Sequence, residues 1–224
     1  TTTASKSACP SPDDYMKSFE GANNIVVVTI TGTLSGSYNS AEIAKKIYLE
    51  EHPDTKIHVI DSLSAGGEVD LIVRKLNHLV AEGLDFDQVV DGITAYQAKT
   101  KLLFVLAKVD NLVKNGRLSK LVGTVVGLLN IRMVGEASKT GTLELLQKAR
   151  GQKKAIKAAF DELLKAGYAG GHITIAHRNN EKFIEQFSEL VREKFAQASI
   201  EVLPTSGLCS FYAEEGGLLM GYEI

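Results

Sequence analysis

The chain has 224 residues, with 25 lysines and arginines against 27 aspartates and glutamates, and a formal net charge of −2. Hydrophobic residues make up 44% of the sequence and charged residues 23%, as in ordinary soluble globular proteins. This balance gives no electrostatic reason to expect binding to nucleic acid or to an anionic membrane. No apolar run approaches the length that spans a bilayer, and the chain can form one large domain or two modest ones.

The cysteine content indicates a compartment and excludes one kind of site. Cys9 and Cys209 lie far apart in the sequence, which favours a reduced, cytoplasmic protein over a disulfide scaffold. The histidines do not have the spacing that would complete a zinc site with them, so we expect no metal. The chain begins at Thr1 and not at a methionine, as a piece excised from a longer protein would.

The first predicted elements are a short helix and a βα unit that follows it. Ser11 as an N-cap, Pro12 in the first turn and the acids that follow predict a short helix ending near Gly21. The β-branched run over residues 25–30 predicts a strand, and apolar residues at helical spacing predict a helix over 39–51. A glycine- and hydroxyl-rich loop joins the strand to the helix.

That loop is the most informative segment of the chain. It offers the hydroxyls of Thr31, Thr33, Ser35 and Ser37 beside the unpaired N–H groups at a helix N-terminus, a combination that suits a carboxylate or a phosphate. It contains no general base and no acidic metal ligand, so we expect anion binding and not catalysis. Ser35 is the strongest candidate, and a simple N-capping role explains it equally well.

The alternation of strands and helices continues through the first half of the chain. We predict a strand over 56–62, helices over 65–81 and 85–97, and a buried strand over 102–107. This order predicts a parallel sheet covered on both faces by helices, to which we assign the strand at 102–107.

The pattern changes near residue 115, and we predict two domains, residues 1–115 and 116–224. The second domain is expected to hold a mixed, largely antiparallel sheet with helices on one side. Its predicted elements are a helix over 119–127, a hairpin of strands 130–134 and 142–146, helices over 151–166 and 180–197, and strands over 172–177, 200–203 and 218–222.

Other polar residues allow a functional and a structural interpretation. Asp61 and Ser62 end a predicted strand, where open parallel sheets bind ligands, but a cap on the next turn explains them equally well. Arg117 is expected to anchor the domain junction, since its guanidinium can bind several carbonyls or a carboxylate. His177 beside Arg178 is a doubtful anion site. No nucleophile elbow, P-loop or catalytic triad is recognisable, which favours a binding protein.

Several motifs, in this order, resemble those of the DegV family of bacterial proteins. They are Ser-Ala-Cys-Pro-Ser-Pro (7–12), Leu-Ser-Gly-Ser-Tyr-Asn-Ser-Ala (34–41), Val-Ile-Asp-Ser (59–62), Asn-Gly-Arg-Leu-Ser (115–119), Leu-Asn-Ile-Arg (129–132), Ala-Arg followed by Lys-Lys-Ala (149–155) and Ile-Ala-His (175–177). The resemblance covers essentially the whole chain. The family's opening strand and its Thr-Asp-Ser loop are not in this sequence, which therefore looks like a member shortened at the N-terminus.

The resemblance implies a fold and a ligand. The fold is a Rossmann-like three-layer α/β/α domain with a parallel sheet, followed by a smaller two-layer α/β domain with a mixed, largely antiparallel sheet. The ligand is a long-chain fatty acid between them, whose chain gains about 0.8 kcal/mol for each buried CH₂. The residues expected at its carboxylate are Ser7, Ser35, Gly36 and Thr31, with Asp61, Ser62 and Arg117 one layer further out.

The resemblance also implies a non-catalytic role. Family members of this type present the fatty acid to a separate kinase that phosphorylates its carboxylate, so we expect no enzyme activity, no cofactor and no metal in this chain. Two alternatives stay open: a phosphotransfer enzyme of the related dihydroxyacetone-kinase-like fold, and an interaction protein that has lost its ligand. Acyl length, partner and oligomeric state are not determined.

One segment departs from the family pattern. The family has a histidine before Gly-Pro-Gly-Ala-Leu-Gly, whereas this chain has Phe-Tyr-Ala-Glu-Glu-Gly-Gly-Leu-Leu over residues 211–219. If Glu214 or Glu215 faced the pocket, it would repel the lipid carboxylate by about 1 kcal/mol at 4 Å in water. Alternatively, both side chains point to solvent.

Overall fold

The computed structural model describes residues 5–118 and 130–224. The predicted helix over 119–127 therefore lies outside the described residues. Within the described parts of the chain, no helix has both the length and the apolar character that crossing a membrane requires.

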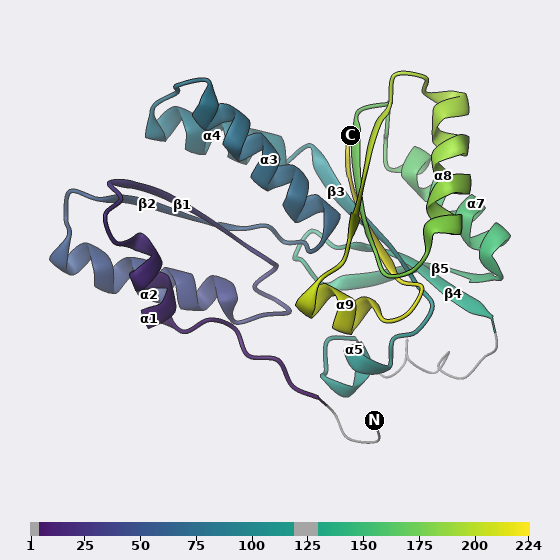
Figure 1. Cartoon of the computed structure of the whole chain (residues 1–224), viewed down its shortest axis with the longest axis horizontal. Helices are drawn as coiled ribbons and strands as arrows, with labels where there is room; N and C mark the ends of the chain where they lie inside the picture. The colour runs from purple at the N-terminus through teal and green to yellow at the C-terminus, as the bar shows by residue number, and fades with distance from the viewer. Residues whose placement is uncertain (1–4, 119–129) are drawn as a thin grey trace.

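The first unit is a parallel two-stranded sheet between two layers of helices (Figure 1). Its strands are β1 (Asn24–Thr29) and β2 (Lys56–Asp61), and its helices are α1 (Pro12–Phe19), α2 (Ser37–Glu51), α3 (Gly67–Ala81) and α4 (Phe86–Gln97). Alternate residues of β1 face opposite layers: Val27 packs with α1 and α2, whereas Val26 and Val28 pack with α3 and α4. The apolar run therefore reflects burial from both sides, and the predicted three-layer arrangement is confirmed.

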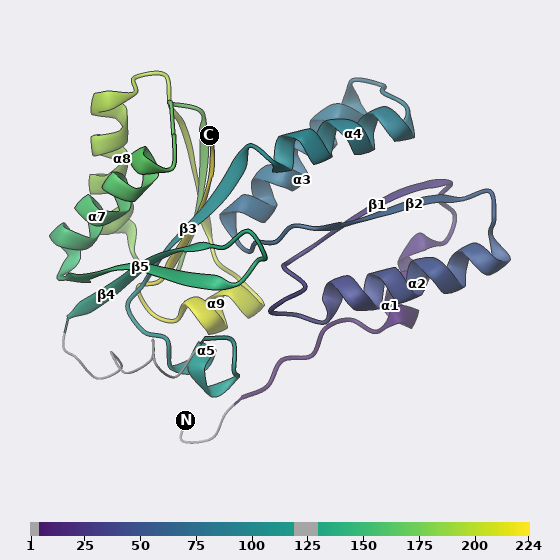
Figure 2. The same cartoon turned by 180° about the vertical axis from the view of Figure 1, so that it is seen from behind.

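The second unit is a mixed six-stranded sheet in the order β5-β4-β3-β8-β6-β7. Among the described strands of this sheet, β6 and β7 pair in parallel and the other neighbours pair antiparallel, as predicted. Helices α7 and α8 cover one face, and the short helices α5 and α9 lie on the other (Figure 2). The bounds are β3 (Thr100–Leu106), α5 (Asp110–Lys114), β4 (Ile131–Ala137), β5 (Leu143–Arg150), α7 (Gln152–Lys165), β6 (His172–His177), α8 (Glu181–Lys194), β7 (Ser199–Pro204), α9 (Gly207–Ala213) and β8 (Leu218–Glu223).

The assignment of β3 to the first, parallel sheet was wrong. This strand pairs antiparallel with β4 and with β8 at the centre of the second sheet. Its apolar run shows burial on both faces, since Leu103 and Val105 pack toward α7 and α8 while Phe104 and Leu106 pack toward α5 and α9. Burial of that kind does not reveal which sheet a strand joins. The domain boundary near residue 115 stays a prediction.

Two of the contacts that join the units bring their backbones close together. The first is between α3 and the strands β8 and β6, where a Cβ on Gly221 of β8 would lie 2.3 Å from the Cα of Glu68 and one on Gly67 would lie 2.1 Å from the carbonyl oxygen of Thr174 on β6. The second is at the tip of the β4–β5 hairpin, where the hydroxyls of Thr31 and Thr33 donate to the carbonyls of Gly141 (3.0 Å) and Thr140 (2.6 Å). These contacts hold the two units around the space between them.

Candidate functional site

An apolar cavity of about 70 Å³ lies between the two units. We call it the apolar cavity; of the described residues that line it, Arg117 alone carries a charge. The lining comprises Ile30, Leu34 and Ala65 of the first unit, Phe104, Leu106, Leu143 and Leu219 near the second sheet, Leu112 of α5, Leu208, Cys209, Tyr212 and Ala213 of α9, and Arg117. This lining suits a hydrocarbon chain that ends in one polar group.

A helix-ending turn directs Arg117 to this cavity. After α5, the N–H of Arg117 donates to the carbonyl of Leu112 (2.8 Å), and the N–H of Gly116 donates to the carbonyl of Val113 (3.1 Å). These two hydrogen bonds are those of a Schellman motif. Gly116 adopts the positive φ of 70° that this motif requires. The Asn-Gly-Arg sequence is thus a local signal for the end of α5 and for the position of the arginine that follows it.

Arg117 connects segments that are far apart in the sequence. Its Nε donates to the carbonyl of Leu34 (2.8 Å), and its guanidinium carbon lies 4.4 Å from the centroid of the Tyr212 ring. Its Nη2 is 3.5 Å from the hydroxyl of Ser7, which in turn lies 3.1 Å from the Tyr212 hydroxyl. The cation, two hydroxyls and an aromatic face therefore gather at the mouth of the apolar cavity. An anion there would meet several donors.

Ser35 and Gly36 shape the loop beside Arg117. Gly36, and not Ser35, occupies the N-cap position of α2. The Ser35 hydroxyl accepts a hydrogen bond from the N–H of Ser37 (3.2 Å) and forms another with the Ser37 hydroxyl (3.0 Å). A Cβ on Gly36 would lie 3.0 Å from the sulfur of Cys9, so the glycine lets the N-terminal segment lie against this loop. The positive end of the α2 dipole is thus close to the predicted carboxylate residues.

Three other predicted residues make hydrogen bonds within the protein. Thr31 is 2% exposed, and its hydroxyl takes part in the hairpin contact described above. The Asp61 carboxylate accepts from the N–H of Gly32 (3.1 Å) and of Leu63 (3.0 Å), and the Ser62 hydroxyl bonds the backbone of Ser64. These bonds match the turn-capping alternative for Asp61 and Ser62. Ligand contact by the three residues stays a prediction.

The acidic residues of the departing segment do not line the apolar cavity. Glu214 accepts from the N–H of Asn111 (2.9 Å) at the start of α5. Glu215 lies 3.6 Å from the Nε of Arg178 and accepts from Asn179 (3.2 Å). The repulsion considered from the sequence therefore does not arise from the positions that these two side chains occupy.

Tyr212, from the same segment, was missed by the sequence analysis. It lies at the cavity mouth beside Ser7 and Arg117. The departure from the family pattern at residues 211–219 marked the segment, but no local signal distinguished Tyr212 from its neighbours. His177, the doubtful candidate, accepts from the N–H of Asn180 (3.2 Å) at the start of α8 and does not line the cavity.

The described cysteines and acids offer little for redox or metal chemistry. Both cysteines are free, and burial raises the pKa of the Cys209 thiol at the cavity wall. In residues 5–118 and 130–224, no group of three or more His, Cys, Asp or Glu side chains is arranged to hold a metal ion.

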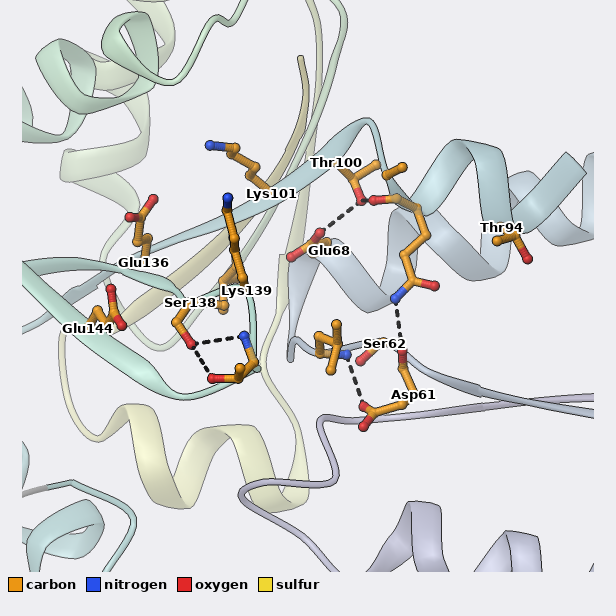
Figure 3. A pocket seen from close by; sticks show the side chains of 16 residues that line it. Asp61, Ser62, Glu68, Thr94, Thr100, Lys101, Glu136, Ser138, Lys139 and Glu144 are labelled. Atoms are coloured by element: carbon orange, nitrogen blue, oxygen red, sulfur yellow. Dashed lines mark hydrogen bonds between the residues drawn. The ribbon is translucent and has the colours of Figure 1, made fainter. Parts of the chain in front are cut away.

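A second and larger space, the polar cleft, lies on the opposite side of the hairpin contact (Figure 3). Its volume is about 950 Å³, and charged side chains from the strands and the hairpin surround it, including Lys101, Glu136, Lys139 and Glu144. Glu68, only 5% exposed, accepts from the Thr100 hydroxyl (2.8 Å), and burial raises the pKa of its carboxyl. The charged side chains around this cleft make it less suited to a hydrocarbon chain than the apolar cavity is.

Comparisons with known proteins agree with the resemblance seen in the sequence. A family model described as an uncharacterised protein of the DegV family matches residues 1–222. A DegV domain-containing protein of Streptococcus pneumoniae is 78% identical over 224 residues, which are 100% of this chain and 80% of the relative. A DegV domain-containing protein of Streptococcus pyogenes is 64% identical over 221 residues, 99% of this chain and 79% of that protein.

Two similar crystal structures contain fatty acids. The Streptococcus pneumoniae Fatty Acid Kinase (Fak) B3 protein loaded with linoleic acid is 78% identical, with a TM-score of 0.98 over 100% of this chain and 80% of that one. A DegV family protein from Eubacterium eligens loaded with heptadecanoic acid is 39% identical, with a TM-score of 0.95 over 100% of this chain and 81% of that one.

Proposed function

The chain belongs to the DegV family, and from this premise we propose that it binds a long-chain fatty acid between its two units and presents the carboxylate to a separate kinase. The observation that carries the proposal is the apolar cavity with a single charged residue, Arg117, among its described lining residues. The fatty acids in the pneumococcal and Eubacterium structures support the choice of ligand.

The acyl chain would occupy the apolar cavity. Leucines, Phe104 and Ile30 form most of its wall, and each buried CH₂ contributes about 0.8 kcal/mol. The cavity of about 70 Å³ is smaller than the roughly 300–1,000 Å³ of typical ligand pockets, so its side chains must repack around the chain. The TM-score of 0.98 to the linoleic-acid-loaded relative argues for local rearrangement and not for a large backbone change.

The carboxylate would lie at the cavity mouth. Ser7, Ser35 and Tyr212 offer hydroxyl donors there, Arg117 offers the positive charge, and Gly36 begins the helix whose dipole favours an anion. Thr31, through its bond to the hairpin, would hold the loop in position. None of the described residues that line the cavity is a carboxylate or an imidazole, so the chain would hold its ligand while a kinase carries out phosphoryl transfer.

The proposal also covers the cellular compartment in which the protein acts. Cys9 and Cys209 are both free thiols, which fits a reduced environment. We therefore propose that the protein acts in the cytoplasm, where a kinase partner and ATP are present together.

Native mass spectrometry of the purified chain tests the proposal. We expect a co-purified mass in the fatty-acid range and, after lipid removal, rebinding of a fatty acid but not of its methyl ester, which lacks the carboxylate charge. Repeated absence of lipid, or equal binding of acid and ester, would contradict it. With ATP and Mg²⁺ the chain alone should form no acyl phosphate; formation would instead support the phosphotransfer alternative.

A further inference from the structure

One level of the second sheet forms the floor of the apolar cavity. Leu219 of β8 and Phe104 of β3 are register partners, and Phe104 is also the partner of Gly135 on β4. Leu219 and Phe104 both line the cavity, whereas Gly135 has no side chain to contribute. The glycine therefore leaves a gap in an otherwise continuous row of apolar side chains.

The Phe104 ring fills this gap. A Cβ on Gly135 would lie 2.3 Å from Cζ of Phe104 and 2.7 Å from Cε2, far inside contact distance. The ring must therefore lie over the backbone of Gly135, and Phe104 is only 3% exposed. A β-bulge between Val134 and Gly135 shifts the register of β4 against β5 at this point. Bulges of this kind change the direction in which neighbouring side chains point.

We propose that Gly135 sets the depth of the apolar cavity by accommodating the Phe104 ring, and that this pair determines which acyl chain length the protein accepts. The inference rests on the proposed function, since it concerns the same ligand. With the ring over Gly135, the space above the floor is left to the ligand. Any side chain at position 135 would push the ring up into the cavity, because close-packed interiors have no spare room.

Two variants alter this floor in opposite directions. Phe104→Leu removes ring atoms and should deepen the cavity. Gly135→Ala should instead push the Phe104 ring into the cavity and make the cavity shallower. The lipid-free proteins are given an equimolar mixture of myristic, palmitic and stearic acids, and the bound masses are measured by native mass spectrometry. We expect the ratio of bound stearic to myristic acid to rise about tenfold in Phe104→Leu and to fall about tenfold in Gly135→Ala.

The double variant Gly135→Ala/Phe104→Leu should return the ratio toward that of the unaltered chain. Leu103→Ala is the matched control, because Leu103 is the neighbour of Phe104 on the same strand but packs toward α7 and α8. It should lower stability and leave the ratio unchanged.

Several outcomes would overturn the inference or separate it from the proposed function. A Cβ at position 135 would also lie 2.2 Å from the carbonyl oxygen of Glu144, so if Gly135→Ala does not fold, Phe104→Leu decides the matter. A Phe104→Leu protein that binds fatty acid with an unchanged ratio refutes the role of the floor. If the unaltered chain binds neither these three acids nor linoleic acid, the proposed function itself fails.

Discussion

The apolar cavity and the polar cleft lie on either side of one contact, yet their linings differ in polarity. The loop over residues 31–33 and the hairpin tip meet between them; Leu34 and Leu143 line the cavity, whereas Ser138 and Thr140 line the cleft. The cleft has by far the larger volume, about 950 Å³ against about 70 Å³. A site for a fatty acid is therefore identified by the chemistry of its lining and not by its volume.

Desolvation explains the difference. An acyl chain in the cleft would remove water from Lys101, Lys139 and the carboxylates there without returning hydrogen bonds. In the cavity the same chain would leave water and pack against leucines and Phe104. This transfer is favourable for each CH₂. The following variants test whether function divides between the two spaces in this way.

Removing the charge at the cavity mouth should have the largest effect. Arg117→Ala is expected to weaken fatty-acid binding by about 2–3 kcal/mol, or roughly 30- to 140-fold in Kd, because a carboxylate would lose a charged donor. Arg117→Lys should lose less binding affinity, since lysine keeps the positive charge but lacks the planar guanidinium group. Isothermal titration with lipid-free protein measures these values.

The matched control in the polar cleft is Lys101→Ala, which also removes one positive charge. It should leave the fatty-acid Kd within a factor of about two, since Lys101 does not line the apolar cavity and solvent screens charges at a distance. If Lys101→Ala weakened binding as much as Arg117→Ala, the ligand would have been assigned to the wrong space.

The next largest effect concerns the loop hydroxyl. Ser35→Ala should weaken binding by about 1.5 kcal/mol, or roughly tenfold in Kd, through loss of one hydrogen bond to a carboxylate. Thr94→Ala, at an exposed helix position in the polar cleft, should leave the Kd unchanged. Equal binding by Ser35→Ala and the unaltered chain would show that Ser35 bonds only the backbone and the hydroxyl of Ser37 and not the ligand.

The contact between Thr31 and the hairpin tip, which separates the two spaces, should stabilise the folded protein. Thr31→Val keeps the side-chain shape but leaves the carbonyl of Gly141 without the hydroxyl that now donates to it. Loss of this buried bond should lower the free energy of unfolding by about 1 kcal/mol, measured by urea denaturation. Thr94→Val, an exposed helix position lining the cleft, is the control and should change stability by less than about 0.5 kcal/mol. A stable Thr31→Val protein would show that the hairpin is held by other contacts.

The smallest expected effect is a pH dependence of stability that arises from Glu68 in the polar cleft. Burial raises the pKa of Glu68 above its ordinary value of 4.5, so the folded state holds this proton more tightly than the unfolded state does. Its contribution to stability is therefore greatest below pH 4.5 and falls as the pH rises toward the folded-state pKa.

Glu68→Gln removes this titration and keeps an oxygen for the Thr100 hydroxyl. The Tm of Glu68→Gln minus that of the unaltered chain should therefore increase from pH 4.5 to pH 8. A constant difference for Glu68→Gln across this range would show that burial does not shift its titration.

Much of the local structure could be predicted from neighbouring residues. The capping box of Ser11 and Asp14 sets the start of α1, and the continuous apolar run on β1 reflects two covered faces. Helices α5 and α9 were missed because five or seven residues are too few to show helical periodicity. Such short helices form through contacts with the rest of the fold.

The sequence by itself determined the strands, the long helices and, through family motifs, the expected ligand, because these depend on residue spacing along the chain. Only the tertiary structure decided that β3 joins the second sheet, that Glu214 and Glu215 stay off the cavity wall, and that Ser7, Arg117 and Tyr212 meet at its mouth. These outcomes depend on contacts between segments up to 205 residues apart. Such contacts follow from the packing of two units around a shared space, and no local pattern encodes them.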